Sequence, residues 1–517
     1  MKRIVSRAAL GASHNILCIT VDRLNVDFLG AYGNTWLETP AFDQLASEAV
    51  LCDSYFIDTV DLEALYSGLW RGTLASQLRL DVIEQQQRAS LFRAMKEKGR
   101  RVYLVSDDEN VALSSWVESE FCDDRLLLQR SVCEEPVDTI EQTQFYRNFE
   151  ELAKLILKLE DHSRLEDAPW FIWAHFSSLN EIWDFPLSRR QQFQETAEDP
   201  EPFAGTKPPF FPLQACEERG KKQTRLEAQG ASEQTEDDDA ETARLRALDP
   251  DDRRQCVVET YAAGVSVFDE TLGGFLALLK EQGVLERTLF VLCGARGFAT
   301  GRPSALGLSQ RYDSDVAPFY AEQVNAPLVI RLPERICATT RLATLCQPCD
   351  LFETLRAYTE FRAQLYSEDF WKLERLDVSP FAGDWSGEQS AYAKRRNLLQ
   401  DDTPDPEAPL PPGQNILALL NKETASLRDR VAIVARDARS QERALFTQSW
   451  ALKERVTTVL EEETPRKIVA RELFYRPDDR YNVVDVASRG QDEVEELTLA
   501  LQRATLDTPA LDRQNQV

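Results

Sequence analysis

Short, continuous apolar runs alternate along the chain with segments whose apolar residues recur every three or four positions. The runs predict strands buried on both faces of a sheet, at residues 16–21, 101–106, 169–176 and 288–293. The recurring positions predict helices, the clearest over residues 259–282, where Val265, Phe268, Leu272, Phe275, Leu276 and Leu279 form one stripe. Thr39-Pro40 predicts the start of another helix, with Thr39 as N-cap and Phe42, Leu45, Ala46 and Ala49 on its inner face.

This alternation predicts the α/β class, with a mostly parallel sheet sandwiched between helices. In such sheets the functional site lies beyond the carboxyl ends of the strands. The residues that directly follow Val21 and Cys293 are therefore the first candidates for a site.

The pattern changes towards the C-terminus, where a smaller domain is expected. Residues 400–413 carry five prolines, which is typical of a linker. Beyond it, residues 431–434 and 444–452 predict strands and residues 490–503 a helix. We therefore expect a large N-terminal domain over residues 1–395, a linker over 396–415 and an α+β subdomain over 416–517. Residues 188–252 read as a poorly ordered acidic insertion, because their apolar content is low.

Charge and composition exclude some partners. The chain has 87 acidic and 60 basic residues, a net charge of −27, so its surface would repel both nucleic acid and an anionic membrane. We find no apolar run near the roughly 20 residues that span a bilayer. The N-terminus is basic, but residues 8–14 are too short and too weakly apolar for a secretory signal, so a cytoplasmic location is expected.

The ten cysteines fall singly in apolar runs and predict buried free thiols rather than a disulfide framework. The one close pair is Cys346-Gln-Pro-Cys349. A single C-x-x-C pair, in a chain with only three histidines, is a weak metal signal.

Several segments, in the right order, resemble the sulfatase family of the alkaline-phosphatase-like hydrolases. Residues 15–24, 29–34 and 39–46 are similar to the first strand, loop and helix of that family. Residues 261–291 are similar to its long helix and the strand that follows, and residues 326–331 to a later strand. Residues 472–487 are similar to its C-terminal signature. The resemblance implies an alkaline-phosphatase-like fold over nearly the whole chain, and the class of sulfuric ester hydrolases.

The family's metal site is altered in this sequence. Sulfatases hold calcium or magnesium with paired Asp residues after the first strand and with Asp plus His or Asn after a later one. Asp22 retains the first position, but Arg23 and Ala295-Arg296 replace the others. A hard cation needs several converging carboxylate oxygens. The resemblance therefore implies that Asp22 is the only retained ligand position, and that no metal cofactor is expected.

The family's nucleophile is a cysteine oxidised to formylglycine within C-x-P-S-R. That position falls on Asp58, and Val60, Asp61 and Leu62 stand where Pro, Ser and Arg belong. The resemblance thus implies that no formylglycine forms. Cys52 lies nearby, but the residues that follow it make it a poor substitute.

Supporting positions differ too. A family histidine corresponds to Asn180, a lysine to Val316, and acids stand at Asp107 and Asp108 where many members carry Lys and His. The sequence is therefore identified as a degenerate member of the family.

Three hypotheses remain open, in decreasing order of preference. The first is a pseudoenzyme that acts as a binding or regulatory homologue, with a protein or a sulfated or anionic small molecule as partner. The second is a non-standard sulfate- or phosphate-ester hydrolase that uses Asp22 and Asp58, since carboxylates can act as nucleophiles. The third is an anion sensor that uses Arg23 and Arg296, whose guanidinium groups suit oxyanions. A structural ion pair between Asp22 and Arg23 or Arg296 is the alternative for these side chains.

Overall fold

A computed structural model describes most of the chain. The described residues are 14–77, 89–166, 168–194, 199–211, 240–301, 306–307, 319–365, 410, 412–421, 426–436, 440–457, 467–476 and 478–506. Val316 and most of the predicted linker lie outside this part, as does the middle of the predicted insertion.

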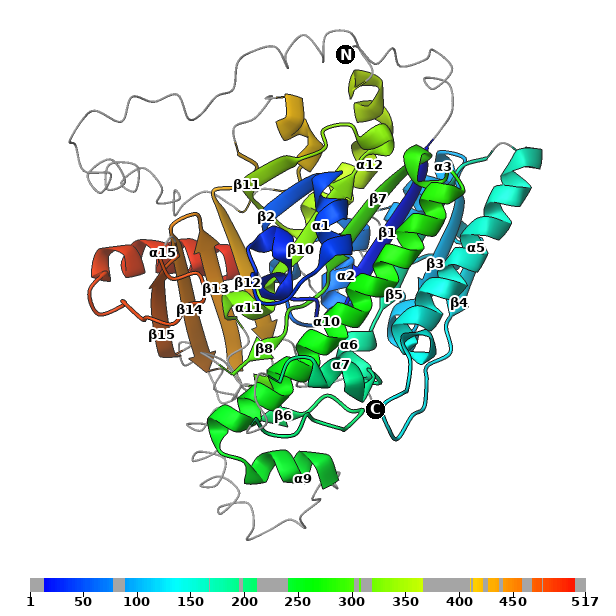
Figure 1. Ribbon diagram of the computed structural model, residues 1–517. Coiled ribbons are helices and arrows are strands. Elements are labelled where there is room, and N and C mark those ends of the chain that lie inside the picture. The colour runs from blue at the N-terminus through cyan, green and yellow to red at the C-terminus, as the bar shows by residue number, and fades with distance from the viewer. Residues whose placement is uncertain are drawn as a thin grey trace, which may run out of the picture.

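An eight-stranded sheet forms the centre of the large domain (Figure 1). Its strands, in spatial order, are β11 (Thr340–Cys346), β2 (Val50–Phe56), β10 (Asn325–Arg331), β7 (Thr288–Gly294), β1 (Asn15–Val21), β5 (Trp170–Phe176), β3 (Arg101–Ser106) and β4 (Asp124–Leu127). Only β10 runs antiparallel to its neighbours. The predicted mostly parallel α/β sheet is confirmed.

Helices cover both faces of this sheet (Figure 1). One face packs against α1 (Pro40–Ser47), α5 (Gln144–Glu166) and α10 (Pro250–Glu281), and the other against α2 (Leu62–Arg71), α3 (Leu91–Glu97) and α12 (Pro348–Leu365). Alternate residues of β1 enter the two cores: Ile16 and Cys18 face one, Leu17 and Ile19 the other. Because both faces are covered, the strands are apolar throughout, which is why the sequence shows them as continuous runs.

Shorter elements complete the large domain. They are α4 (Glu109–Ala112), α6 (Ser178–Glu181), α7 (Leu187–Gln191), α9 (Ala240–Ala247), α11 (Ala321–Val324), and a small sheet of β6 (Phe210–Phe211), β9 (Leu306–Gly307) and β8 (Ala299–Thr300).

The first turns of two helices are capped by residues that the sequence did not predict. Helix α10 begins at Pro250 rather than near residue 259, because Asp249 caps it by accepting from the N–H groups of Asp251 and Asp252. Its first turns are polar, so they carry no apolar period. Helix α1 begins at Pro40 as predicted, but Thr39 makes no side-chain cap. The carboxylate of Asp269 accepts from the N–H groups of Ala41 and Phe42 instead, at 3.1 and 2.8 Å.

Helix α10 is also, by length and composition alone, apolar enough to cross a membrane, a weak test that core helices pass too. Here its apolar side chains, among them Val265, Phe268 and Leu272, lie buried against the sheet and α5.

The C-terminal subdomain is a four-stranded antiparallel sheet with one covering helix. Its elements are β12 (Arg430–Arg436), β13 (Ser440–Thr447), β14 (Trp450–Thr457), β15 (Lys467–Tyr475) and α15 (Gln491–Leu506). The predicted single strand over 444–452 is wrong: a turn at Gln448 and Ser449 divides it into β13 and β14. Thr447 closes this turn by accepting from the N–H groups of Ser449 and Trp450.

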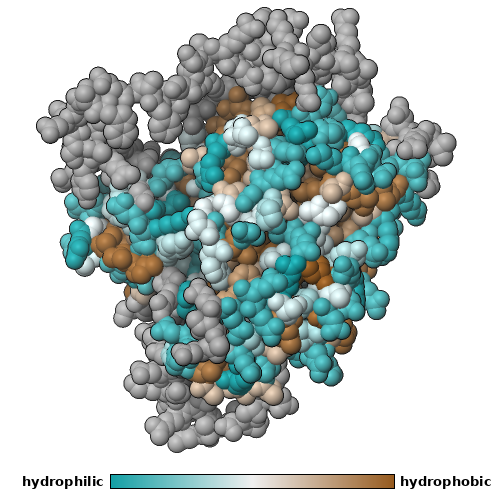
Figure 2. Space-filling model, in the orientation of Figure 1, coloured by the Kyte–Doolittle hydropathy of each residue, from teal (hydrophilic) through white to brown (hydrophobic). Residues whose placement is uncertain are grey.

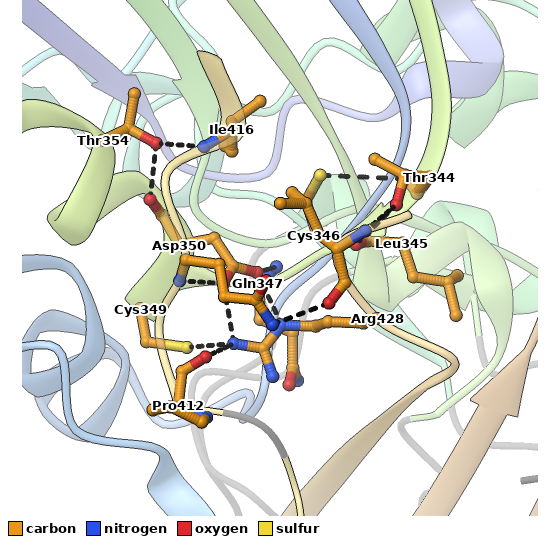
Figure 3. Close-up of polar contacts among 12 residues, drawn as sticks. Thr344, Leu345, Cys346, Gln347, Cys349, Asp350, Thr354, Pro412, Ile416 and Arg428 are labelled. Carbon is orange, nitrogen blue, oxygen red and sulfur yellow. Dashed lines mark hydrogen bonds and ion pairs between the residues drawn. The ribbon is translucent and has the colours of Figure 1, made fainter. Parts of the chain in front are cut away.

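A buried ion pair joins the C-terminal sheet to the large domain (Figure 3). Arg428, just before β12, donates to both carboxylate oxygens of Asp350 in the first turn of α12, at 2.6 and 2.7 Å. The Arg428 side chain also donates to the Pro412 carbonyl and to Sγ of Cys349. Both charged side chains are fully buried, so the hydrogen bonds replace the water that each group loses.

The cysteines of the C-x-x-C pair, Cys346 and Cys349, are buried thiols outside any disulfide, as are Cys18, Cys52, Cys256 and Cys293, and the other described cysteines form no disulfide and are partly buried. Among the described cysteines, the absence of a disulfide framework is confirmed for all nine, and burial for six of them.

Replacing Asp350 by Asn should lower the free energy of unfolding by about 3–5 kcal/mol, because it leaves the buried Arg428 guanidinium without its counter-charge. The double variant Asp350→Asn/Arg428→Met should recover part of the loss. Glu97→Gln, which breaks an exposed pair with Arg93, is the control and should change stability little. Urea denaturation of the three variants measures these differences; a loss no larger than that of Glu97→Gln would contradict the role assigned to the pair.

Candidate functional site

The carboxyl ends of β1, β5 and β7 bring together residues that are far apart in the sequence. The N–H of Asp22 donates to the Phe176 carbonyl at 2.9 Å, which joins the ends of β1 and β5. The N–H of Ala295 donates to the Val21 carbonyl at 3.0 Å, which joins the ends of β7 and β1. Because these strands are parallel, Asp22 and Arg296 leave the sheet at the same edge.

Arg296 binds the Asp22 carboxylate in a two-pronged ion pair. Its Nε donates to Oδ1 at 2.9 Å, and a terminal guanidinium nitrogen donates to Oδ2. A second terminal nitrogen donates to the Val60 carbonyl at 3.2 Å. Asp22 is fully buried and the Arg296 side chain is 11% exposed. Burial alone would raise the pKa of Asp22, but the charge and hydrogen bonds of Arg296 lower it to about 2. Asp22 is therefore an anion whose two oxygens are both occupied.

Arg23 lies beside this pair and points to other acceptors. Its Nε donates to Oδ1 of Asn180 at 3.0 Å, and a terminal nitrogen donates to the Gly297 carbonyl at 3.3 Å. Its backbone has a φ of 65°, in the left-handed region that arginine seldom adopts, and the Tyr261 hydroxyl donates to its carbonyl. Burial, together with repulsion by Arg296, lowers the pKa of Arg23 to about 9. Four predicted site residues, Asp22, Arg23, Asn180 and Arg296, are thus one connected cluster.

Asp58 follows β2 and makes different contacts. Its Oδ2 accepts from the Ala75 N–H at 2.7 Å, and its carbonyl accepts from the Val434 N–H of β12. Its Oδ1 is buried without a hydrogen-bond partner among the described residues. Burial raises the pKa of Asp58 to about 7. The described contacts therefore hold Asp58 at the junction with the C-terminal sheet, rather than against Asp22.

Sequence reasoning missed His175. It is the penultimate residue of β5 and is fully buried, and its Nδ1 lies 2.6 Å from the Tyr66 hydroxyl, while Nε2 has no partner among the described residues. Burial lowers the pKa of His175, although Asp22 and Asp107 oppose the shift. A histidine near the carboxyl end of an apolar strand was the one signal that could have identified it.

The surrounding acids have other partners. Asp107 accepts from the Ser177 N–H and from Asn148, and Asp61 caps α2. Arg130 pairs with Asp108 and Glu181 at the rim. Within the described ranges, no group of three or more His, Cys, Asp and Glu side chains could hold a metal ion. One carboxylate beside two guanidinium groups does not fit calcium or magnesium, which require several oxygens.

A protein-family model and several solved structures are similar to this chain. The family model described as Sulfatase matches residues 14–360. The chain therefore belongs to the sulfatase family, as the resemblance predicted. No curated protein matches the sequence.

Solved structures share the fold at low sequence identity. A phosphonate monoester hydrolase of Agrobacterium radiobacter is 15% identical with a TM-score of 0.57, and the match covers 94% of each chain. A protein bound to its substrate D-glucosamine-2-N,6-O-disulfate is 15% identical with a TM-score of 0.59, covering 96% of this chain and 99% of the other. A sulfatase-like protein of Bacteroides thetaiotaomicron is 16% identical with a TM-score of 0.56, covering 96% and 91%. These matches show the alkaline-phosphatase-like fold.

Replacing Asp22 by Asn should lower the free energy of unfolding by about 3–5 kcal/mol, because the variant leaves Arg296 charged and unpaired in a buried site. Asp22→Asn/Arg296→Gln should recover much of the loss. Asp53→Asn, which breaks the more exposed pair with Arg341, is the matched control and should have a small effect. Thermal and urea unfolding measure all three; equal effects of Asp22→Asn and Asp53→Asn would show that the buried pair contributes little.

Asp58→Asn should stabilise the protein at high pH and have less effect at low pH. The folded state raises the pKa of Asp58 from 3.8 to about 7, so wild-type stability is full below the unfolded value and falls as the pH rises towards 7. Asn stays neutral throughout. Above about pH 7.5 we expect a gain of up to a few kcal/mol, and near pH 5.5 roughly half of that, at 1.36 kcal/mol per pKa unit. Unfolding in urea at both pH values tests this, and a gain independent of pH would refute the shift.

Proposed function

We propose that the chain is a sulfatase-family protein that lacks metal-assisted ester hydrolysis and acts as a binding or regulatory homologue. The observation that carries the proposal is the ion pair of Asp22 and Arg296. In metal-assisted hydrolysis a cation polarises the ester and supports the nucleophile. Here both carboxylate oxygens of Asp22, the one retained ligand position, accept hydrogen bonds from the Arg296 guanidinium group.

Charge supports the same conclusion. Asp22 contributes one negative charge, whereas Arg23 and Arg296 contribute two positive charges to the same cluster. A dication placed there would compete with Arg296 for Asp22 and be repelled by both guanidinium groups. The cluster thus carries its own positive charge covalently and needs no cation.

The nucleophile position also supports loss of activity. Asp58 is 1% exposed, one of its oxygens is bound by the Ala75 N–H, and its pKa is about 7. A carboxyl group that is about half protonated near pH 7 is a weaker nucleophile than a fully ionised one. Cys52 is a buried thiol within β2. A hydrolase that uses Asp22 and Asp58 is accordingly the weaker alternative.

In the anion-sensor alternative, Arg23 and Arg296 would both bind one sulfate or phosphate group. The Arg296 guanidinium already donates to Asp22 and the Val60 carbonyl, and that of Arg23 donates to Asn180 and the Gly297 carbonyl. An anion would have to displace these acceptors, Asp22 among them. We therefore place partner binding first. Its proposed location is cytoplasmic, which the free thiols of the described cysteines support.

The test is an assay of the purified protein with an aryl sulfate and an aryl phosphate, each with and without calcium. We expect no turnover above the buffer rate, and no change in melting temperature on addition of calcium, because a site that does not bind the ion gains no stability from it. Turnover that is lost in both Asp22→Ala and Asp58→Ala would overturn the proposal.

A rebuilt site serves as the positive control. Arg23→Asp, Ala295→Asp and Arg296→Asn together restore the carboxylate and amide oxygens that a hard cation needs. In this triple variant calcium should raise the melting temperature, whereas in wild type it should not. Calcium stabilisation of wild type that is lost in Asp22→Asn would show that the native cluster binds the ion.

A further inference from the structure

A groove on the far side of α10 from the sheet has no role in the cluster around Asp22. It encloses about 540 Å³ between the segment before α1, helix α7 and the middle of α10. Its walls include Trp36, Glu38, Arg189, Phe193, Glu270 and Gly274. Figure 2 shows that the face carrying α1, α7 and α10 is mostly hydrophilic, with small hydrophobic patches.

One wall of the groove is aromatic. Trp36 is 46% exposed, and it is the one exposed tryptophan in the described part of the chain. Its ring lies 5.3 Å from that of Phe193 and 6.3 Å from that of Phe28. Its main-chain N–H donates to Oδ1 of the Asn34 side chain at 2.8 Å. These contacts hold one face of the indole ring at the surface in a fixed orientation. The Trp36 side chain would therefore lose little conformational entropy when a ligand binds.

The floor of the groove is made by two glycines in the middle of α10. Gly273 has a packing reason, because a Cβ there would lie 3.2 Å from Cβ of Ala41 in α1. Gly274 has none, since a Cβ there would meet no atom within 4 Å. Glycine in a helix interior lowers stability relative to alanine. Gly274 therefore lowers the stability of the helix relative to alanine, and the absence of a side chain there leaves open space in the groove.

The charges of the groove are mainly negative. Three acids, Glu38, Asp269 and Glu270, stand against one base, Arg189. Asp269 caps α1, and Glu270 pairs with Arg189. Glu38 is exposed, and the chain as a whole carries a net charge of −27. The field at the groove therefore favours a cation and disfavours a sulfate or phosphate group.

We propose that this groove binds a lysine or arginine side chain from a basic segment of a partner protein. The cation would lie over the face of Trp36, an arrangement that the ring quadrupole favours. Its aliphatic stem would lie along Phe193 and the open floor at Gly274, and Glu38 would supply the counter-charge. The groove does not share residues with the Asp22 cluster, so the proposal holds whether or not that cluster hydrolyses an ester.

The test measures binding of a dye-labelled hexalysine peptide to the full chain by fluorescence anisotropy, at low and at physiological salt. Trp36→Ala should weaken binding about tenfold, which corresponds to a cation–π contribution of about 1.4 kcal/mol. Glu38→Gln should weaken it severalfold, and Gly274→Met, which fills the floor without changing charge, should also weaken it. Glu281→Gln, on the same helix but outside the groove, is the charge-matched control and should bind like wild type.

The variants separate a specific groove from diffuse attraction. If Glu38→Gln and Glu281→Gln weaken binding equally and Trp36→Ala has no effect, the peptide binds the acidic surface in general and the proposal is wrong. If instead a neutral oligosaccharide binds and Trp36→Ala abolishes its binding while the peptide does not bind, the groove is a sugar site. Circular dichroism shows whether Trp36→Ala is folded, and Gly274→Met gives an independent result.

Discussion

The structure at the carboxyl ends of β1, β5 and β7 depends on one interaction, the buried ion pair between Asp22 and Arg296. Parallel pairing of β1 with β7 forces the two residues to the same edge of the sheet. At that depth an unpaired carboxylate or guanidinium group would be costly, so each residue constrains the other. Arginine is charged at every physiological pH and presents a fork that matches a carboxylate. It therefore neutralises Asp22 permanently, whereas a bound ion would do so only while present.

The same pair explains the conformation of its neighbour. The Arg296 guanidinium already binds both oxygens of Asp22, and the Arg23 guanidinium instead donates to Asn180 and the Gly297 carbonyl, while only the main-chain N–H of Arg23 donates to Asp22. The left-handed backbone at Arg23 is tolerated because the Tyr261 hydroxyl and the ends of three strands hold the loop. Asp58, which the family pattern associates with this centre, is instead held by Ala75 and by the C-terminal sheet.

A binding role is compatible with what the rest of the molecule preserves. The sheet, both layers of helices and the junction made by the paired charges of Arg428 and Asp350 form the framework of the molecule. The groove beside Trp36 lies on a different face of α10 from the apolar residues that bind the sheet. Its charged side chains Glu38 and Glu270 are exposed, so changes at these positions should leave the core intact.

Much of the fold could be predicted from local patterns. Strands such as β1 and β7 appear as continuous apolar runs because they are buried on both faces, and the stripe from Val265 to Leu279 identifies the C-terminal half of α10. Features set by polar contacts were harder: the cap at Asp249, the cap that Asp269 supplies to α1 from another helix, and the turn at Gln448 and Ser449 leave little trace in hydrophobic periodicity.

For the site, the sequence by itself determined which residue types are present: one carboxylate at Asp22, arginines at 23 and 296, and an acid at Asp58. Only the tertiary structure decided that the guanidinium of Arg296 rather than that of Arg23 binds Asp22, that Asp58 is held elsewhere, and that His175 lies in the same buried region. The reason is physical. Residue identity sets what a group can donate or accept, but which partner it meets depends on strand order and on the direction of each side chain, and residues 22 and 296 become neighbours only when β1 and β7 pair.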